Sequence, residues 1–210
     1  IELLLILALG LLLGIKHGLE PDHIIAVSTI ASRSKTLWRS SLSGVFWGIG
    51  HTTTLLIFGI VLIIFKQEIP ETWSMSLEFI VGIILVYFGV TSLRVGKQTY
   101  PHDSSHKDRS SYVKSLFIGL IHGLAGSAAM VLITMSTVKE VWEGAVYIFI
   151  FGIGTCIGML TFTTLLGIPF VVTKGKLTIN RTLTQIAGLI NIFFGLYYMY
   201  NLGINEQLFS

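Results

Sequence analysis

Long apolar runs constrain this chain more than any other feature of its sequence. Six segments are apolar along nearly their whole length, and short polar stretches separate them: residues 3–31, 40–65, 74–93, 112–137, 142–173 and 181–202. Because about 20 mostly apolar residues can cross the hydrocarbon core of a bilayer as a helix, each segment can span a membrane once. We therefore predict an all-α, polytopic membrane protein with six transmembrane helices. The fifth segment is the longest, and we expect it to be tilted, bent or interrupted.

Composition supports this class and excludes others. Only 12% of the residues are charged, against about 25% in soluble domains. The net charge of +3 needs no nucleic acid as a partner, and the expected surroundings are a lipid bilayer. The single cysteine, Cys156, excludes a carrier that exchanges disulfides between two thiols of one chain.

The basic residues favour one orientation in the membrane. Eleven of the fourteen lysines and arginines lie in three alternate loops, around residues 33–39, 94–114 and 174–181. Cytoplasmic loops carry an excess of such residues. We therefore predict a multi-pass protein of the cell membrane with its basic loops in the cytoplasm and both termini outside.

The two halves of the chain resemble each other. "GIKHGLEPDH" from residue 14 aligns with "GLIHGLAGSA" from residue 119, which pairs His17 with His122. Two further pairs of stretches align at nearly the same offset and pair His51 with Thr155 and Gly82 with Gly188. With three spans each, the halves would insert with opposite topology, which is typical of secondary transporters. We predict inverted repeats over residues 1–97 and 112–210, joined by a polar cytoplasmic loop at 98–111.

Ionisable residues interrupt the first apolar segment. On a continuous helix His17, Asp22 and His23 would point in different directions, because each residue turns by about 100°. Gly18 tolerates unusual backbone angles, and Pro21 cannot continue a helix but suits the first turn of a new one. We therefore predict that the first helix breaks near Gly18–Pro21. Irregular backbone at membrane depth is tolerated where it lines a cavity.

The residues around this break are typical of a metal site. His17, Asp22 and His23 offer two imidazoles and a carboxylate, and His51 lies deep in the second span. Such a set suits nickel, cobalt, zinc, copper or iron, whereas magnesium and calcium prefer oxygen ligands. These four residues are the predicted metal ligands. Four further residues are candidates, either as ligands or as groups that support the ligands: Glu20, Thr52, His122 and Thr155. Glu20 equally suits the cap of the second half-helix.

Two motifs resemble those of the nickel/cobalt transporter family. "HGLEPDH" matches its His-x-x-x-x-Asp-His signature at His17, Asp22 and His23, and "FWGIGHTTTLL" resembles its second motif at His51 and Thr52. The stretch "GLIHGLAGSAAM" resembles the compact branch of that superfamily, which includes urease-accessory nickel permeases and related exporters. The resemblance implies that the first motif selects and transports a divalent metal ion.

The predicted function is therefore a permease for divalent transition-metal cations, favouring nickel or cobalt as substrate, in which two halves rock around the His/Asp site. No cofactor is expected. No phosphate-binding loop is present, so transport would use an ion or voltage gradient or need an additional subunit. A metallochaperone is left open as a partner. The alternatives are a metal exporter of the same superfamily and, from another class, an intramembrane His-Asp acyltransferase or zinc-dependent enzyme.

Glu78 lies near the outer end of the third predicted span. Its position predicts an interfacial residue.

Overall fold

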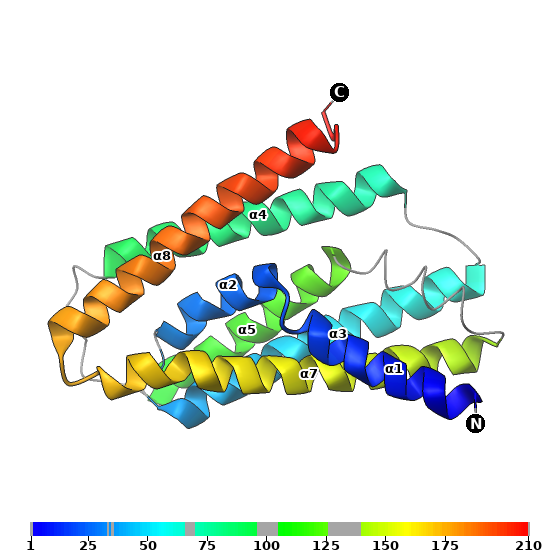
Figure 1. Cartoon of the computed structure of the whole chain (residues 1–210), viewed down its shortest axis with the longest axis horizontal. Coiled ribbons are helices and arrows are strands. Elements are labelled where there is room, and N and C mark those ends of the chain that lie inside the picture. Colours follow the sequence, from blue (N-terminus) through cyan, green and yellow to red (C-terminus); the bar gives the residue numbers. More distant parts are fainter. Residues whose placement is uncertain are drawn as a thin grey trace.

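The computed structural model describes residues 2–32, 34, 36–65, 70–95, 105–125 and 140–209, and all regular structure in these ranges is helical (Figure 1). The elements are α1 (Glu2–His17), α2 (Pro21–Ser32), α3 (Leu37–Phe65), α4 (Glu71–Val95), α5 (Ser105–Ala125), α7 (Val141–Val172), α8 (Leu177–Tyr200) and the short π-helix η1 (Asn201–Asn205). This confirms the predicted all-α class.

Most of the helices are long and apolar enough to cross a bilayer. In the described ranges α3, α4, α7 and α8 each meet that condition, and the bent pair α1–α2 meets it jointly. Helix α5 contributes a shorter apolar stretch, Tyr112–Ala125, and residues 126–137 of the predicted fourth span lie outside the described part. The chain is a multi-pass membrane protein.

Two elements differ in detail from the sequence prediction. Helix α5 begins at Ser105, inside the segment 98–111 that was predicted to be a polar loop. Helix α7 is a single helix of 32 residues, so the interruption considered for the fifth span is wrong. At 1.5 Å per residue α7 is about 48 Å long. It therefore extends beyond a hydrocarbon core of about 30 Å without needing a break.

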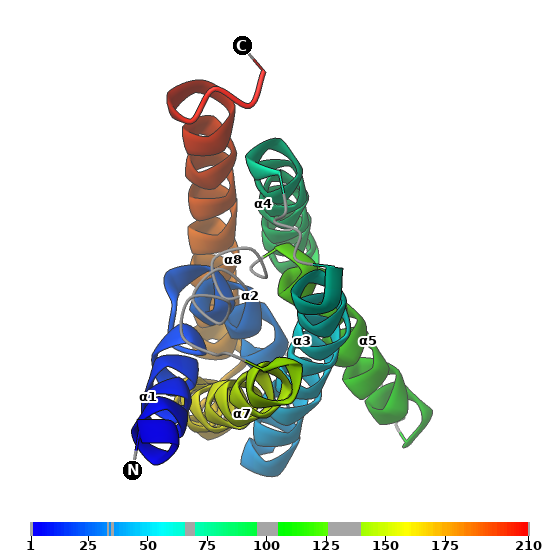
Figure 2. The same ribbon diagram turned by 90° about the vertical axis from the view of Figure 1, so that its right-hand side faces the viewer.

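The helices form a layer of four and a separate pair. Helices α1, α7, α3 and α5 pack side by side in that order, α4 packs along α8, and α2 lies between the layer and the pair (Figure 2). Helices α1, α2, α3 and α4 come from the first half of the chain, and α5, α7 and α8 come from the second. The two halves therefore interleave, so each long contact joins elements far apart in the sequence.

Glycines allow the backbones in the layer to approach closely. Gly14 of α1 lies against the carbonyl oxygen of Phe151 on α7, and Gly119 of α5 lies against that of Trp47 on α3. A side chain at either glycine would overlap the facing backbone. Small residues are the usual means of close helix packing in lipid, where the hydrophobic effect does not drive helices together.

The α4–α8 pair is built in the same way. A Cβ on Gly195 would lie 2.8 Å from the oxygen of Gly82, and a Cβ on Gly188 would lie 2.9 Å from the oxygen of Gly89. The two glycine contacts are seven residues apart on each helix. They hold α4 and α8 against each other as one unit.

A buried apolar cluster holds α2 between the layer and the pair. It consists of Ala26, Val27, Trp47, Val81, Leu85, Ala125 and Met159. These side chains come from α2, α3, α4, α5 and α7. The cluster therefore fixes the start of α2, where the predicted ligands lie, relative to four other helices.

Candidate metal site

The break between α1 and α2 lies where the sequence predicts it. Helix α1 ends at His17, α2 begins at Pro21, and the two axes are bent by 55°. The amides of Leu19 and Glu20 donate to the carbonyls of Lys16 and His17, at 2.9 and 3.0 Å, so the connecting turn keeps its backbone hydrogen bonds. Pro21 has no amide hydrogen to lose at the first position of the new helix.

Gly18 serves the break for a different reason than the one predicted. No glycine in the described ranges has a positive φ, so Gly18 does not adopt a backbone conformation reserved for glycine. A Cβ at this position would lie 2.7 Å from the carbonyl oxygen of Thr155 on α7. The requirement is for small size, because α1 turns away while in contact with the α7 backbone.

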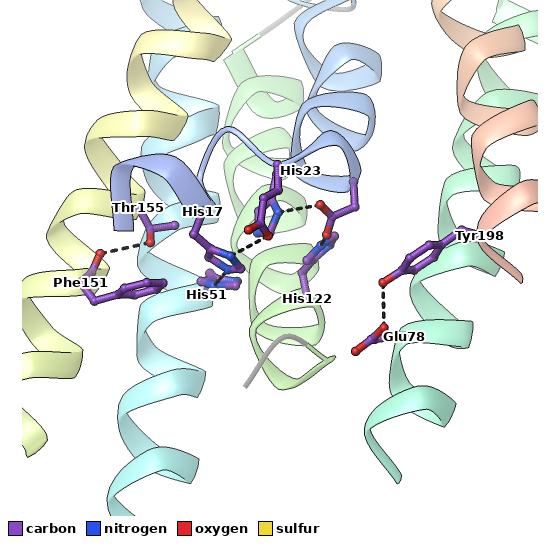
Figure 3. Close-up of polar contacts among 10 residues, drawn as sticks. His17, His23, His51, Glu78, His122, Phe151, Thr155 and Tyr198 are labelled. Atoms are coloured by element: carbon purple, nitrogen blue, oxygen red, sulfur yellow. Dashed lines mark hydrogen bonds and ion pairs between the residues drawn. The ribbon is translucent and has the colours of Figure 1, made fainter. Parts of the chain in front are cut away.

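Three imidazoles meet at the break. One ring nitrogen each of His17 on α1, His23 on α2 and His51 on α3 lies within 4.8 Å of the others (Figure 3). The Nε2 atoms of His17 and His51 are 3.1 Å apart. Two nitrogens bound to one ion at 2.0–2.1 Å are themselves about 3.0–3.4 Å apart, so this separation suits two ligands of a single ion.

The two deeper imidazoles have nitrogen atoms available for a ligand. His23 and His51 are 1% and 0% exposed. Nε2 of His23 and Nδ1 of His51 have no hydrogen-bond partner in the described part of the protein. Because unpartnered buried polar atoms are costly and uncommon, a bound cation is a reasonable partner for at least one of them.

Asp22 links the cluster to the second half of the chain. Its Oδ1 lies 3.2 Å from Nδ1 of His23, and its Oδ2 lies 2.6 Å from Nε2 of His122 on α5. Asp22, His23 and His122 form a second group whose ligand atoms lie within 4.8 Å of one another. His122, which is almost completely buried, therefore belongs to the site, as its alignment with His17 suggested.

Glu20 supports the remaining imidazole. Its Oε2 lies 2.8 Å from Nδ1 of His17, and its side chain is 44% exposed. A carboxylate on the second nitrogen of a histidine sets the orientation and tautomer of the ring and raises its basicity as a ligand. His17 has such a carboxylate partner in Glu20, and His23 has one in Asp22.

Aromatic side chains border the imidazoles, which sequence reasoning did not predict. The ring of Trp47 is 5.5 Å from that of His122 and 6.3 Å from that of His23, and Phe151 is 5.3 Å from His17. Trp47 is completely buried. Its position four residues before His51, on the same helix face, was a usable signal.

Two predicted residues do not join the cluster. The Thr155 hydroxyl donates to the carbonyl of Phe151 at 3.1 Å (Figure 3). The Thr52 hydroxyl lies 4.0 Å from the sulfur of Cys156. In the described part of the protein neither hydroxyl bonds to an imidazole. Threonine hydroxyls within helices are commonly satisfied by a backbone carbonyl of the preceding turn, as Thr155 is.

A further polar group lies apart from the imidazoles. Glu78 on α4 is half-buried and accepts hydrogen bonds from Ser74 at 3.3 Å and from Tyr198 on α8 at 2.9 Å (Figure 3). The interfacial role predicted for Glu78 did not anticipate a partner 120 residues away. Such a contact depends on the α4–α8 packing.

The fold and the cluster define the class: a multi-pass membrane protein with histidines and a carboxylate gathered at a broken helix. Urease accessory protein UreH of Bacillus sp. (strain TB-90) is 60% identical over 100% of this chain and 97% of its own length. The family described as the cytochrome C biogenesis protein transmembrane region matches residues 92–197. The chain therefore belongs to the family of UreH, and its second half to the cytochrome C biogenesis transmembrane family.

More distant relatives are two chloroplast proteins of Arabidopsis thaliana, FOR GROWTH AND FERTILITY 2 and 1. Each is 28% identical over 89% of this chain, which spans about half of their length, 54% and 56%. No solved structure matches. Membership in the UreH family confirms the resemblance to the urease-accessory branch. The relative from Bacillus is named an accessory protein, and this membership gives the acyltransferase and zinc-enzyme alternatives no support.

Proposed function

We propose that this protein is a cell-membrane permease that carries divalent transition-metal cations, with nickel or cobalt as its substrate. The observation that carries the proposal is the convergence of His17, His23 and His51 at a break inside a membrane-spanning helix pair. Ionisable groups in a membrane mark ion pathways more often than they serve structure alone.

The chemistry of the ligands narrows the substrate class. Imidazole nitrogens suit nickel, cobalt, zinc, copper and iron better than magnesium or calcium. The related protein from Bacillus is named a urease accessory protein, and the motif resemblance to nickel/cobalt transporters favours nickel or cobalt within that group. The metal ion is the substrate, so no resident cofactor is part of the proposal.

Some residues of the site would bind the ion, and others would position the binding residues. His17, His23 and His51 would bind the ion through ring nitrogens that lie within 4.8 Å of one another. Glu20 would orient the His17 ring, and Asp22 the His23 ring, in each case by a contact with the Nδ1 atom of the histidine. His122 would hold Asp22 from the opposite side.

The two halves are proposed to be inverted repeats. Two matched glycine contacts support this: Gly14 lies on Phe151, and Gly119 lies on Trp47. In the alignment of the two halves Gly14 corresponds to Gly119, and Trp47 corresponds to Phe151. Helices α1 and α2 run along the bundle in one direction as a broken span, and α3, α4, α5, α7 and α8 then alternate in direction (Figure 1). Both termini would then face outward, with the basic loops in the cytoplasm.

Alternating access would involve the α4–α8 pair and not the sequence halves themselves. The halves interleave in the four-helix layer, whereas α4 and α8 pack mainly on each other. Helix α2 is tied to α8 by a hydrogen bond from Asn191 to Ser28 at 3.1 Å. Movement of the pair would therefore act on α2, the helix that carries Asp22 and His23.

Membrane potential can supply the energy for uptake. A doubly charged ion that moves inward across 100 mV gains about 4.6 kcal/mol. A metallochaperone or an additional subunit that receives the ion inside remains compatible with this scheme.

The test is metal flux into proteoliposomes that contain the purified protein, with nickel, cobalt and zinc compared. Variants His17→Ala and His23→Ala should lose the flux. His106→Ala is the matched control, because it makes the same change in the polar segment 98–111. Flux that survives in both site variants would contradict the site. Absence of flux for every metal in the unmodified protein, with orientation checked, would contradict the permease. Loading the metal on either side tests uptake against export.

A further inference from the structure

Glu78 is a carboxylate inside a membrane-spanning helix, and its hydrogen-bond partners among the described residues are hydroxyl groups. It lies seven residues after the start of α4, which is about 10 Å along the helix axis. Its two hydrogen bonds come from Ser74 and Tyr198, and no basic side chain in the described ranges contacts it. A carboxylate in this setting is costly and, by default, points to a function.

The packing of α4 on α8 does not require this carboxylate. The crossing contains two glycine contacts, Gly82 with Gly195 and Gly89 with Gly188. Glu78 lies four residues before Gly82, and Tyr198 lies three residues after Gly195.

The corresponding positions beside the other glycine contact hold different residues. Thr184 lies four residues before Gly188, and Ser92 lies three residues after Gly89. Both are almost completely buried, and the Thr184 hydroxyl donates to the carbonyl of Asn180 in its own helix. Neutral side chains thus occupy the corresponding positions at the second contact, although the Ser92 hydroxyl has no hydrogen-bond partner among the described residues. A carboxyl group is therefore not needed there for the two helices to pack.

The Glu78 helix also contacts the helix that carries part of the metal site. Val81 and Leu85 of α4 pack in one buried cluster with Ala26 and Val27 of α2. In Figure 3, Glu78 and Tyr198 lie on the α4–α8 side of the cluster, beyond His122. A change in the charge of Glu78 would act on the same pair of helices that is proposed to move α2.

We propose that Glu78, held by Tyr198 and Ser74, binds and releases a proton and thereby couples proton movement to metal transport. This inference rests on the proposed function. A proton from one aqueous side joins the carboxylate to give the neutral acid, and it leaves to the other side after α4 and α8 have moved. The oxygen-only environment suits a proton and offers none of the imidazole ligands that bind the metal.

Other titratable groups around Glu78 belong to the same environment. They are Tyr198 on α8, Glu206 at the end of η1 and Asp22 on α2, whose carboxylate is bonded to His122 of α5. Glu206 is bonded to Asn201, and none of these groups is a cation paired with Glu78. Glu78 is therefore the carboxylate of this environment that has only hydroxyl partners.

The experiment compares the unmodified protein with Glu78→Gln in proteoliposomes under an imposed pH gradient of one unit. If one proton is coupled to each ion, the steady-state nickel ratio should change about tenfold with the gradient, since one unit of pH corresponds to a factor of ten. Glu78→Gln should show no such change, while nickel–nickel exchange at equal pH persists. Tyr198→Phe keeps the carboxyl group and should weaken the response. Thr184→Val, at the corresponding position, is the control and should respond normally.

Infrared spectroscopy tests proton binding without transport. The carbonyl bands of protonated carboxylic acids appear as pH falls, and the component that comes from Glu78 should be present in the unmodified protein and missing in Glu78→Gln. A gradient response in Glu78→Gln equal to that of the unmodified protein, or an identical band in both, would overturn the proposal. If the band depends on Glu78 but the unmodified protein moves no metal, the permease function fails and proton binding at Glu78 stands.

Discussion

Helices α1 and α5 bring corresponding histidines to the centre of the molecule in different chemical settings. His17 precedes Gly18, which lies against the carbonyl oxygen of Thr155. His122 precedes Gly123, which lies against the carbonyl oxygen of His51. The backbone contact is of the same kind in both places. It places one imidazole from each half beside the same cluster.

The two settings differ after the glycine. Helix α1 ends at His17 and the chain turns into α2, which begins with Pro21 and supplies Asp22. Helix α5 continues through His122 to Ala125. Both histidines have a carboxylate partner, Glu20 for His17 and Asp22 for His122. Of the two, only His17 also has a ring nitrogen within hydrogen-bond distance of a second imidazole in the described part of the chain, that of His51. The contrast teaches that close packing can be duplicated while the candidate ligands come mainly from the copy with the broken helix.

The strongest test of this contrast is His17→Ala. We expect it to lower nickel affinity by more than about 100-fold, because loss of a group that only orients a ligand already costs 10–100-fold. Isothermal titration in detergent would measure the change. An affinity within a few-fold of the unmodified protein would show that the α1 histidine does not bind the ion.

Asp22→Asn should have the next largest effect. The carboxylate bonds to both His23 and His122, so its loss should release two rings and lower nickel affinity by about 10–100-fold. Glu20→Gln makes the same chemical change at a more exposed partner of His17 and should cost less. Equal losses in both variants would contradict the central role of Asp22.

Gly18→Ala and Gly123→Ala sharpen the comparison at the level of packing. The added methyl group would lie 2.7 Å from Thr155 O in one case and 2.5 Å from His51 O in the other. We expect each to destabilise the protein by about 1–3 kcal/mol, the usual cost of overpacking. Thermal unfolding in detergent measures this. Gly175→Ala, with no neighbour within 4 Å, is the control and should be neutral. A large loss at only one of the two positions would break the parallel.

His122→Ala should have the smallest effect on binding. It leaves the three converging imidazoles in place and removes one of two partners of Asp22. We expect a loss of nickel affinity at the low end of the range for supporting residues, about tenfold. A loss as large as that in His17→Ala would instead make His122 a ligand and the two histidines equivalent.

The sequence alone was sufficient for the class, the break and several residues of the candidate site. Apolar length follows from bilayer thickness, and Pro21 ends a helix because it has no amide hydrogen. The two motifs led to His17, Asp22, His23 and His51, of which the structure brings three imidazoles together with the carboxylate beside them.

Other features were decided only by the tertiary structure. When a span is apolar on every side, its sequence does not show which face meets lipid and which meets another helix. The sequence therefore could not show that His122 reaches Asp22 and that Thr155 does not. The same limit applies to Gly18, whose role depends on the α7 backbone, and to Glu78, whose partner Tyr198 lies 120 residues further along. Local chemistry determines where a helix can break, but only packing determines which distant atoms meet there.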